Sequence, residues 1–395
     1  MQIAIIGGGM IAHDQILPSV YQMQRMGLVG PVEVCARHAA TLDKLAAAEP
    51  ILRAFPGHSF RPRLEPYSEV IAGLPPYQLV VVALPDDVHF DAVMTALRHD
   101  QHVLCVKPLV LTVAQSIEIE NEARTRGLLV GIEYHKRFDD RSLLARRRYQ
   151  SGLFGEFKLG TACLLEKWYY RHSNFQNWFT VDASDAFTYI GCHYVDLVAF
   201  VTGLRPTAVS VYGIRDKFPN GNEGWLWTDA RVLWDNGACL NVQNALGFPD
   251  AAPGTNMQSL TMYCSNGQVG GWLHHSDQFR GMQYCYTANP GGDGMNTYAE
   301  PSPDYFQYVD VGGPGLTPVG YGYRSTAYIV ERALEMQGRD LAARQQLLTQ
   351  WDEAGVMATP ANSRYNEAVV EAARQSIRDN GRMVPVASQA AAQIP

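Results

Sequence analysis

The sequence lacks the features of a disulfide-stapled, exported or membrane-spanning protein. Its seven cysteines are scattered singly, with no C-x-x-C pair, so we expect reduced thiols and neither a disulfide framework nor a zinc site. No apolar run approaches the roughly 20 residues that a membrane-spanning helix needs. Met1 leads directly into an apolar strand without a basic and apolar leader, so the expected location is cytoplasmic.

Charge is also scarce. Only 18% of the residues are charged, and acidic residues are in excess, with a formal net charge of −7. This balance argues against nucleic acid and against an anionic membrane surface as partners. At 395 residues, of which 47% are hydrophobic, the chain is long enough for more than one core, so two domains are expected.

A glycine-rich turn follows the first apolar run, which extends from Gln2 to Ile6. The turn reads Gly7-Gly8-Gly9-Met10-Ile11-Ala12, which is G-x-G-x-x-A before a segment able to start a helix. In a dinucleotide site the first glycine permits the turn, the second admits the pyrophosphate, and the small last residue allows close packing. Free N–H groups at the helix start would bind the phosphates. A plain turn is the alternative, but the position after the first strand favours a nucleotide.

The second strand, at 32–36, is followed by Arg37 and not by an acid. An acid there would bind the ribose 2′-hydroxyl of NAD. Glu33 lies inside the strand, too early for that role. Arg37 could instead contact a 2′-phosphate or stack on adenine, which slightly favours NADP over NAD. A surface arginine beside an NAD site is the alternative.

Strands and helices then alternate up to Tyr134. We expect further strands at 78–84, 102–106 and 128–134, with helices at about 88–98 and 112–126. The alternation predicts a doubly wound parallel sheet of the Rossmann type over residues 1–134. Ligands bind beyond the carboxyl ends of such strands, and Lys107 occupies that position. A partly desolvated lysine there can act in proton transfer, although an exposed loop lysine is the alternative.

The pattern changes after Tyr134. A basic helix is expected at about 141–150, and later strands are joined by hairpin signals at 235–237 and 266–267. Residues 135–395 should therefore form an α+β domain with a large, mainly antiparallel sheet. Sheets of this kind often pair between subunits, so a homodimer or homotetramer is expected. The chain should be helical again over about 325–350 and 363–380.

A loop of aromatic, amide and basic residues follows a strand near 158–166. Such a mixture suits a sugar or polyol, which has apolar ring faces and many hydroxyls. A packed structural loop is the alternative. The His-His-x-Asp grouping at 274–277 has neither helical spacing nor cysteine partners, so no metal site is expected. The expected substrate-binding residues are Lys167, Trp168, Tyr169, Arg171, His172 and Asp185.

Residues 185–203 are predicted to form a buried helix that carries polar side chains. His193 and Asp196 are three residues apart and share one face, so the carboxylate could hold the imidazole in one tautomer. An oriented histidine is the usual proton-transfer group near neutral pH. A core histidine beside an acid is the alternative.

Together these motifs resemble the Gfo/Idh/MocA family of NAD(P)-dependent sugar and polyol oxidoreductases. The resemblance covers nearly the whole chain. Besides the glycine turn it rests on Ala83-Leu84-Pro85 with His89, on His102-Val103-Leu104-Cys105-Val106-Lys107-Pro108-Leu109, and on Gly191-Cys192-His193-Tyr194-Val195-Asp196. It implies that the residues beside the cofactor are Gly7, Gly9, Met10, Ile11, Ala12, Arg37, Leu84, Pro85, His89 and Lys107.

The resemblance also implies roles for single residues. Lys107 matches the lysine of the family's E-K-P motif, which assists proton transfer and positions the substrate. His193 matches the histidine of its D-x-G-x-H-x-x-D motif, the usual general base, and Asp196 supports it as the motif's last acid. Two positions depart: Val106 replaces the Glu, and Tyr189 replaces the first Asp, which removes a carboxylate that would raise the basicity of His193.

The sequence thus predicts hydride transfer between nicotinamide and a secondary hydroxyl or ketone of a sugar, polyol or glycoside. His193, Lys107 and Tyr189 are the expected proton-handling residues. One alternative is a redox-neutral enzyme with tightly bound NAD that cleaves or isomerises glycosides by transient oxidation. The other is a non-catalytic cofactor-binding sensor, against which the retention of Lys107 and His193 argues.

Overall fold

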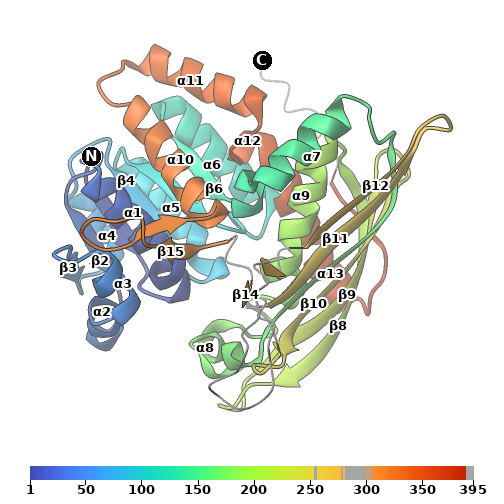
Figure 1. The fold of residues 1–395 in the computed structure, drawn as a ribbon, viewed down its shortest axis with the longest axis horizontal. Coiled ribbons are helices and arrows are strands. Elements are labelled where there is room, and N and C mark those ends of the chain that lie inside the picture. The colour runs from blue at the N-terminus through green and yellow to red at the C-terminus, as the bar shows by residue number, and fades with distance from the viewer. Residues whose placement is uncertain (253–255, 277–278, 281–299, 302–304, 388–395) are drawn as a thin grey trace, which may run out of the picture.

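The computed structural model describes residues 1–252, 256–276, 279–280, 300–301 and 305–387. The chain forms two sheets, each packed against helices, that lie side by side (Figure 1). Strands of the N-terminal half, blue to cyan, make the first sheet, and a broad curved sheet makes the second. The predicted fold class, a Rossmann sheet followed by an α+β region, is confirmed.

The first sheet is parallel, with the strand order β3-β2-β1-β4-β5-β6. Residues of β1, β4, β5 and β6 are buried throughout because helices cover both faces, which explains their unbroken apolar sequences. In sheets of this order the ligand lies where the strand order reverses, beyond β1 and β4. The strands are β1 (Ile3–Ile6), β2 (Val32–Cys35), β3 (Arg61–Arg63), β4 (Leu79–Val82), β5 (His102–Val106) and β6 (Val130–Glu133).

Helices form the two layers over this sheet, and each layer has its own apolar core. The N-terminal glycine turn leads into a continuous helical segment made of η1 and α1. The helices are η1 (Ala12–Ile16), α1 (Leu17–Arg25), α2 (Ala39–Ala46), α3 (Glu49–Ala54), α4 (Tyr67–Ala72), η2 (Asp86–Val88), α5 (His89–Arg98) and α6 (Val113–Arg126).

The second sheet has the strand order β12-β11-β7-β10-β9-β8-β17. Its neighbouring strands are antiparallel except for β7 and β10, which confirms the prediction of a mainly antiparallel sheet. Alternate residues of its long strands are buried, as expected when helices cover only one face. The strands are β7 (Phe157–Lys167), β8 (Pro206–Lys217), β9 (Glu223–Trp234), β10 (Cys239–Phe248), β11 (Asn256–Ser265), β12 (Gly270–Ser276) and β17 (Val384–Pro385).

The buried face of this sheet packs on α9 and α13 in a third core (Figure 1). The predicted helix at 185–203 is present as two segments, η5 (Phe187–Gly191) and α9 (Cys192–Thr202). Gly203 ends it in the left-handed conformation, at φ +79°. The other helices of this region are η3 (His135–Phe138), α7 (Asp140–Gln150), η4 (Trp168–His172), α8 (Phe175–Trp178) and α13 (Tyr365–Arg378).

Helices between residues 321 and 363 return to the first sheet. Tyr321, Ile329 and Trp351 share a core with Ile3 and Ile5 of β1. The predicted division at residue 134 separates the strands of the two sheets, but these later helices pack on the first. The elements are β13 (Phe279–Arg280), β14 (Glu300–Pro301), β15 (Gln307–Val309), β16 (Thr317–Val319), α10 (Tyr321–Glu335), α11 (Leu341–Ala354) and α12 (Pro360–Ser363).

A buried ion pair joins η3, which closely follows the last strand of the first sheet, to α9. Arg137 of η3 donates from Nε and Nη2 to the Asp196 carboxylate on α9, at 2.8 and 2.6 Å. Tyr365 and Asn366 at the start of α13 donate to the same carboxylate, at 3.0 and 2.8 Å. Both charged side chains are only 2% exposed. One carboxylate therefore fixes three elements relative to one another.

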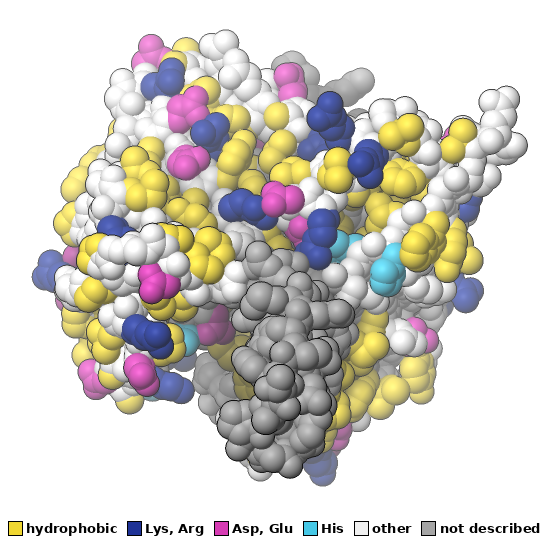
Figure 2. All heavy atoms as spheres, in the orientation of Figure 1, with side chains coloured by type: hydrophobic (Ala, Val, Ile, Leu, Met, Phe, Trp, Pro, Cys, Tyr) yellow, Lys and Arg dark blue, Asp and Glu magenta, His cyan; other side chains and the backbone are white. Residues whose placement is uncertain are grey.

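None of the described helices is long and apolar enough to cross a membrane. Figure 2 shows acidic and basic side chains interspersed over the visible face. Within the described part of the chain the cysteines are free thiols. Cys35 and Cys105 lie in strands as predicted, and Cys163 and Cys239 are half-buried, not fully buried.

We predict that Asp196→Ala destabilises the protein by about 3–5 kcal/mol, because it leaves the Arg137 guanidinium buried without its counter-charge. Urea unfolding of the parent and the variant measures this. Glu118→Gln is the control, since it removes a carboxylate from an exposed pair with Arg98 at 3.7 Å and should cost less than about 1 kcal/mol. Equal losses in the two variants would contradict the assignment of the buried pair as a structural tie.

Candidate active site

The glycine turn closes tightly on the neighbouring strand. Gly7 has φ +110°, and a Cβ atom there would lie 2.0 Å from the carbonyl oxygen of Ala83, after β4. Only glycine fits this close approach. The turn therefore places the following residues at the carboxyl edge, beside the point where the strand order reverses.

Gly9 differs from Gly7 because its surroundings are open. A Cβ atom at Gly9 would have no heavy atom within 4 Å. The amide of His13 donates to the Gly9 carbonyl at 3.1 Å, so the helix begins there and leaves its first N–H groups without helical acceptors. Met10 and Ile11 are half-buried, and Ala12 is buried against the sheet. These features fit a dinucleotide pyrophosphate.

The end of β2 carries no acid, as predicted. Arg37 follows the strand and is exposed. Glu33 is buried and accepts hydrogen bonds from Arg61 and Arg63, at 3.3 and 2.7 Å. The Glu33 carboxylate therefore pairs with arginines of β3 and is not available to bind a ribose hydroxyl.

His89 has a different role from the one predicted. The side chain is fully buried, with Nδ1 2.8 Å from the Pro108 carbonyl and Nε2 2.8 Å from the Leu84 carbonyl. Burial alone lowers the pKa of His89, but Cys105, Asp86 and the Leu84 carbonyl together raise it to about 10. Only the doubly protonated ring can donate to both carbonyls. His89 joins the loops that follow β4 and β5, and the prediction that it lines the cofactor site is corrected accordingly.

Lys107 and Tyr189 are brought together from distant parts of the sequence. Lys107 directly follows β5, and its ammonium group donates a short hydrogen bond to the Tyr189 carbonyl. The same nitrogen lies 3.7 Å from the centroid of the Tyr189 ring. Tyr189 thus contacts the lysine through a cation–π interaction.

An aromatic group surrounds the other side of Tyr189. The rings of Phe175, Trp178 and Phe179 lie 4.9, 5.8 and 6.0 Å from it, centroid to centroid. Burial first, then the negative charges of Asp86 and Glu166, raises the pKa of Tyr189 well above its ordinary value. Tyr189 therefore stays protonated at neutral pH, so its phenol can donate a hydrogen bond.

His193 lies one helical turn after Tyr189 and is only 5% exposed. Burial first, then the Coulombic influence of Lys107, His135 and Lys136, lowers its pKa well below the ordinary value. Its Nδ1 is buried and has no hydrogen-bond partner in the described residues. The ring is thus neutral at neutral pH and able to accept a proton.

The prediction that Asp196 holds the His193 imidazole is wrong. Both carboxylate oxygens of Asp196 are used by Arg137, and Oδ1 also accepts from Tyr365 and Asn366. Residues three apart share a helix face, but here a buried guanidinium from another element satisfies the acid. Asp196 acts on His193 only by holding α9 in place.

Three of the expected substrate-binding residues have internal partners instead. Lys167 donates to the backbone carbonyls of Pro249, Asp250 and Ala252. Arg171 donates to the Leu246 carbonyl at 2.5 Å and to the Asp216 carboxylate at 2.6 Å.

Asp185 is the third, and it accepts hydrogen bonds from the backbone and hydroxyl of Thr188, at 2.8 and 2.6 Å. All three side chains are buried. Lys167 and Arg171 hold the aromatic loop in place, and Asp185 holds the start of η5. A structural role therefore fits these three residues better than substrate binding.

The other members of this set are accessible. Trp168 and Tyr169 are 42% and 47% exposed, and His172 is also exposed. Tyr170 links the loop to the site, since its ring packs on Phe175, which in turn packs on Tyr189. The loop therefore adjoins the aromatic side of the site.

Two site residues escaped the sequence motifs. Glu133 ends β6, and His135 begins η3 two residues later. His135 Nδ1 lies 2.9 Å from Glu133 Oε2, and its ring centroid lies 4.6 Å from that of His193. Their position after a parallel strand is the same signal that identified Lys107, and it could have identified them too.

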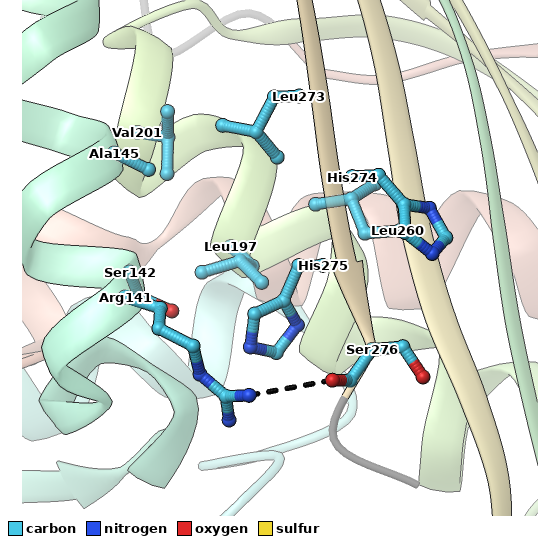
Figure 3. Close-up of a pocket in the computed structure, with 10 residues that line it drawn as sticks. All are labelled: Arg141, Ser142, Ala145, Leu197, Val201, Leu260, Leu273, His274, His275 and Ser276. Atoms are coloured by element: carbon cyan, nitrogen blue, oxygen red, sulfur yellow. Dashed lines mark hydrogen bonds between the residues drawn. The ribbon is translucent and has the colours of Figure 1, made fainter. Parts of the chain in front are cut away.

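A separate cavity of about 320 Å³ lies between α7, α9 and the strands β11 and β12 (Figure 3). Figure 3 shows Leu197, Val201 and Leu273 around it, with Arg141 donating to the Ser276 carbonyl at 3.3 Å. Lys107, Tyr189 and His193 do not line it. This cavity is therefore separate from the residues at the strand ends.

The histidines of the 274–277 grouping are used structurally. His274 Nδ1 lies 2.9 Å from the Thr261 hydroxyl, and His275 Nε2 lies 2.9 Å from the Asp139 carboxylate. Asp277 lies outside the described residues. Among those residues, no three potential ligands group around a metal position.

The strand order and the glycine turn define a Rossmann-type nucleotide-binding protein. The family model "Oxidoreductase family, NAD-binding Rossmann fold" (Gfo/Idh/MocA) matches residues 1–134. Residues 1–134 are thus similar to the NAD-binding domain of the Gfo/Idh/MocA oxidoreductases.

Curated relatives match over part of their length. An uncharacterized oxidoreductase of Schizosaccharomyces pombe is 35% identical over 79 residues, 20% of this chain and 21% of the relative. D-glucoside 3-dehydrogenase of Escherichia coli is 26% identical over 221 residues, 53% of this chain and 56% of the relative. The chain thus spans only a fifth to about half of the length of these relatives.

Solved structures resemble the chain over nearly its full length. Scyllo-inositol dehydrogenase from Lactobacillus casei, with bound NAD(H) and scyllo-inositol, has a TM-score of 0.65 at 14% identity, covering 98% of this chain and 99% of that one. GenD2 from gentamicin A biosynthesis, in complex with NAD, has a TM-score of 0.67 at 17% identity, covering 98% and 97%. At these identities the likeness concerns the fold.

We predict that Gly9→Ala weakens NADH binding about tenfold or more, because the added methyl group would occupy space where the pyrophosphate approaches the backbone. Its melting temperature should stay close to that of the parent, since no protein atom lies in the way. NADH fluorescence titration and thermal unfolding measure the two effects. Gly7→Ala is the contrasting variant and should unfold at a lower temperature, because its methyl group would meet the Ala83 carbonyl.

Proposed function

We propose that this protein is an NAD(P)-dependent oxidoreductase that transfers hydride between nicotinamide and a secondary hydroxyl or ketone of a sugar, polyol or glycoside. One observation carries the proposal. Lys107, Tyr189 and His193 lie close together at the carboxyl edge of the first sheet, the same edge that holds the glycine turn. These three side chains come from two domains. Their convergence beside a nucleotide-binding turn supports chemistry on a molecule held between them.

The residues of the first domain would hold the cofactor. Gly9 and the first turn of the following helix would bind the pyrophosphate, and Leu84 and Pro85 lie on the loop after β4. Bound nicotinamide supplies the hydride acceptor and donor. The exposed Arg37, with Glu33 committed to Arg61 and Arg63, supports NADP somewhat more than NAD.

His193 would accept the hydroxyl proton during oxidation, because its neutral ring has a free lone pair at neutral pH. Lys107 would hold the same oxygen by donating a charged hydrogen bond. Tyr189, kept protonated by its raised pKa, would donate a second hydrogen bond. The aromatic rings around Tyr189 exclude water from one side of the site.

A carbohydrate-like substrate is supported by two observations. Trp168 and Tyr169 offer exposed aromatic faces near the site, as sugar rings require. The relatives named above include a D-glucoside 3-dehydrogenase and a dehydrogenase with bound scyllo-inositol.

Self-association is supported by an exposed apolar row on the open face of the second sheet. Leu159, Tyr263 and Trp272 are direct neighbours across β7, β11 and β12 and are 49%, 51% and 61% exposed. Apolar side chains in such a row favour a protein partner, and a second copy of the chain is the one we propose.

We predict that Lys107→Met and His193→Asn each lower kcat about 10²- to 10⁴-fold, since each removes a proton-handling group. NAD(P)H absorbance with a panel of sugars, polyols and glycosides measures the loss. The pKa of His193 lies below its ordinary value of about 6.5, so the ring stays in its base form at pH 6.5 and above. Protonation of His193 should therefore not slow oxidation as the pH falls from about 8 to about 6.5.

Tyr189→Phe is the companion variant, since it keeps the ring over Lys107 and loses only the donor. It should lower kcat less than either substitution above. Parent-like turnover in both Lys107→Met and His193→Asn would refute the assignment. Turnover with co-purified NAD and no net NADH would favour the redox-neutral reaction instead.

We predict that Arg37→Ala raises KM for NADP about tenfold while changing KM for NAD little, because it removes the cation available to a 2′-phosphate. Initial rates with each cofactor give the ratio. Arg53→Ala, at the end of α3, is the control for loss of a basic side chain from this domain. An equal rise for both cofactors would contradict recognition of the 2′-phosphate by Arg37.

A further inference from the structure

A carboxylate and a second imidazole stand in a row with His193. Glu133 Oε2 lies 2.9 Å from Nδ1 of His135, and the ring centroid of His135 lies 4.6 Å from that of His193. Glu133 and His135 come from the carboxyl end of β6, whereas His193 comes from α9. The row therefore runs from the first sheet into the candidate site.

His193 by itself is poorly suited to keep a proton. Burial and three nearby cationic or ionisable groups disfavour its charged form. Its buried Nδ1 has no acceptor in the described part of the chain, so a protonated ring would carry one unsatisfied N–H. A proton taken from substrate must therefore move on before the next turnover.

The Glu133–His135 pair has what His193 lacks. A carboxylate hydrogen-bonded to an imidazole stabilises the positive charge that the ring gains on protonation. The other oxygen of Glu133, Oε1, is buried with no hydrogen-bond partner among the described residues. The carboxylate charge therefore acts mainly on His135. The His135 side chain is 13% exposed, which gives a transferred proton a way to solvent.

We propose that Glu133 and His135 form a proton relay that discharges His193, an inference that rests on the proposed function. During oxidation the substrate C–H bond breaks and its electron pair leaves as hydride to the nicotinamide. The O–H proton goes to His193, then to His135 beside the Glu133 carboxylate, and finally to solvent. Reduction uses the same path in reverse, so that the relay delivers the proton to the new hydroxyl.

The ring geometry sets how the proton passes between the histidines. Their planes are tilted by 37° with centroids 4.6 Å apart, and no direct hydrogen bond joins the two rings in the described part of the chain. The transfer therefore needs a bridging hydroxyl group, from substrate or from water. A polyol with several hydroxyls is well suited to supply one.

The surrounding lysines and tyrosines hold their own protons, so they do not compete for the one that leaves His193. Lys107 and Lys136 face His193 as cations. The ring of His135 packs against Tyr305 and Tyr321, at 5.0 and 5.5 Å. Burial and then Glu133 raise the pKa of Tyr305 well above its ordinary value. On the other side of His193, burial likewise raises the pKa of Tyr134.

The test compares His135→Asn and Glu133→Gln with the parent in steady-state oxidation. His135→Asn removes the group that accepts the proton, and Glu133→Gln removes the negative charge. Both variants nearly keep the size of the side chain. We expect kcat to fall about 10- to 100-fold with NADH binding unchanged, and the solvent deuterium isotope effect on kcat to increase. His275→Asn is the matched control, because His275 forms the same kind of pair with Asp139 at 2.9 Å outside the relay, and it should keep the parent kcat.

Chemical rescue separates a relay from simple packing. Added imidazole should restore part of the rate of His135→Ala and should not raise the rate of His275→Ala. A packing role predicts no rescue.

Parent-like kcat and isotope effect in His135→Asn and Glu133→Gln would overturn the relay while leaving the proposed function intact. Loss of folding or of NADH binding in both would assign the pair to packing and also overturn it. A parent protein that binds NADH but transfers hydride to no sugar, polyol or glycoside would instead overturn the proposed function itself.

Discussion

The buried ion pair between Arg137 and Asp196 is the constraint on which the rest of the site depends. Two charges that are only 2% exposed are stable only when they are fully paired. Tyr365 and Asn366 complete the coordination of the carboxylate, so η3, α9 and α13 cannot move independently. Because His135 lies on η3 and His193 on α9, the same pair sets the spacing of the two imidazoles.

The site is assembled from strand ends on one side and a single helical segment on the other. Gly9, Lys107 and Glu133 follow or end β1, β5 and β6, whose carboxyl ends share one edge of the sheet. Tyr189 and His193 lie one turn apart and face that edge. The Tyr189 ring contacts Lys107, and a carboxylate, that of Glu133, is paired with His135.

Much of this arrangement could be predicted from local sequence. Gly7, Gly9 and Lys107 were identified because strand–turn–helix order fixes where such residues lie. Lys167, Arg171 and Asp185 are not predictable in this way, because a charged residue near an aromatic loop gives the same sequence pattern whether it binds substrate or backbone. Asp196 was paired with His193 because both lie on one helix, and nothing in the helix shows that Arg137, 59 residues earlier, takes the acid.

The sequence by itself determined the Rossmann order, the glycine turn and the candidate proton-handling residues, because these depend on periodicity and on spacing within a few residues. Only the tertiary structure decided which polar groups face the site and which hold the fold together. Hydrogen-bond partners of buried charges come from distant elements, and local sequence does not encode that choice. The strand end at β6 marks Glu133 and His135 as candidates, but only the packing of η3 against α9 brings the His135 ring to His193.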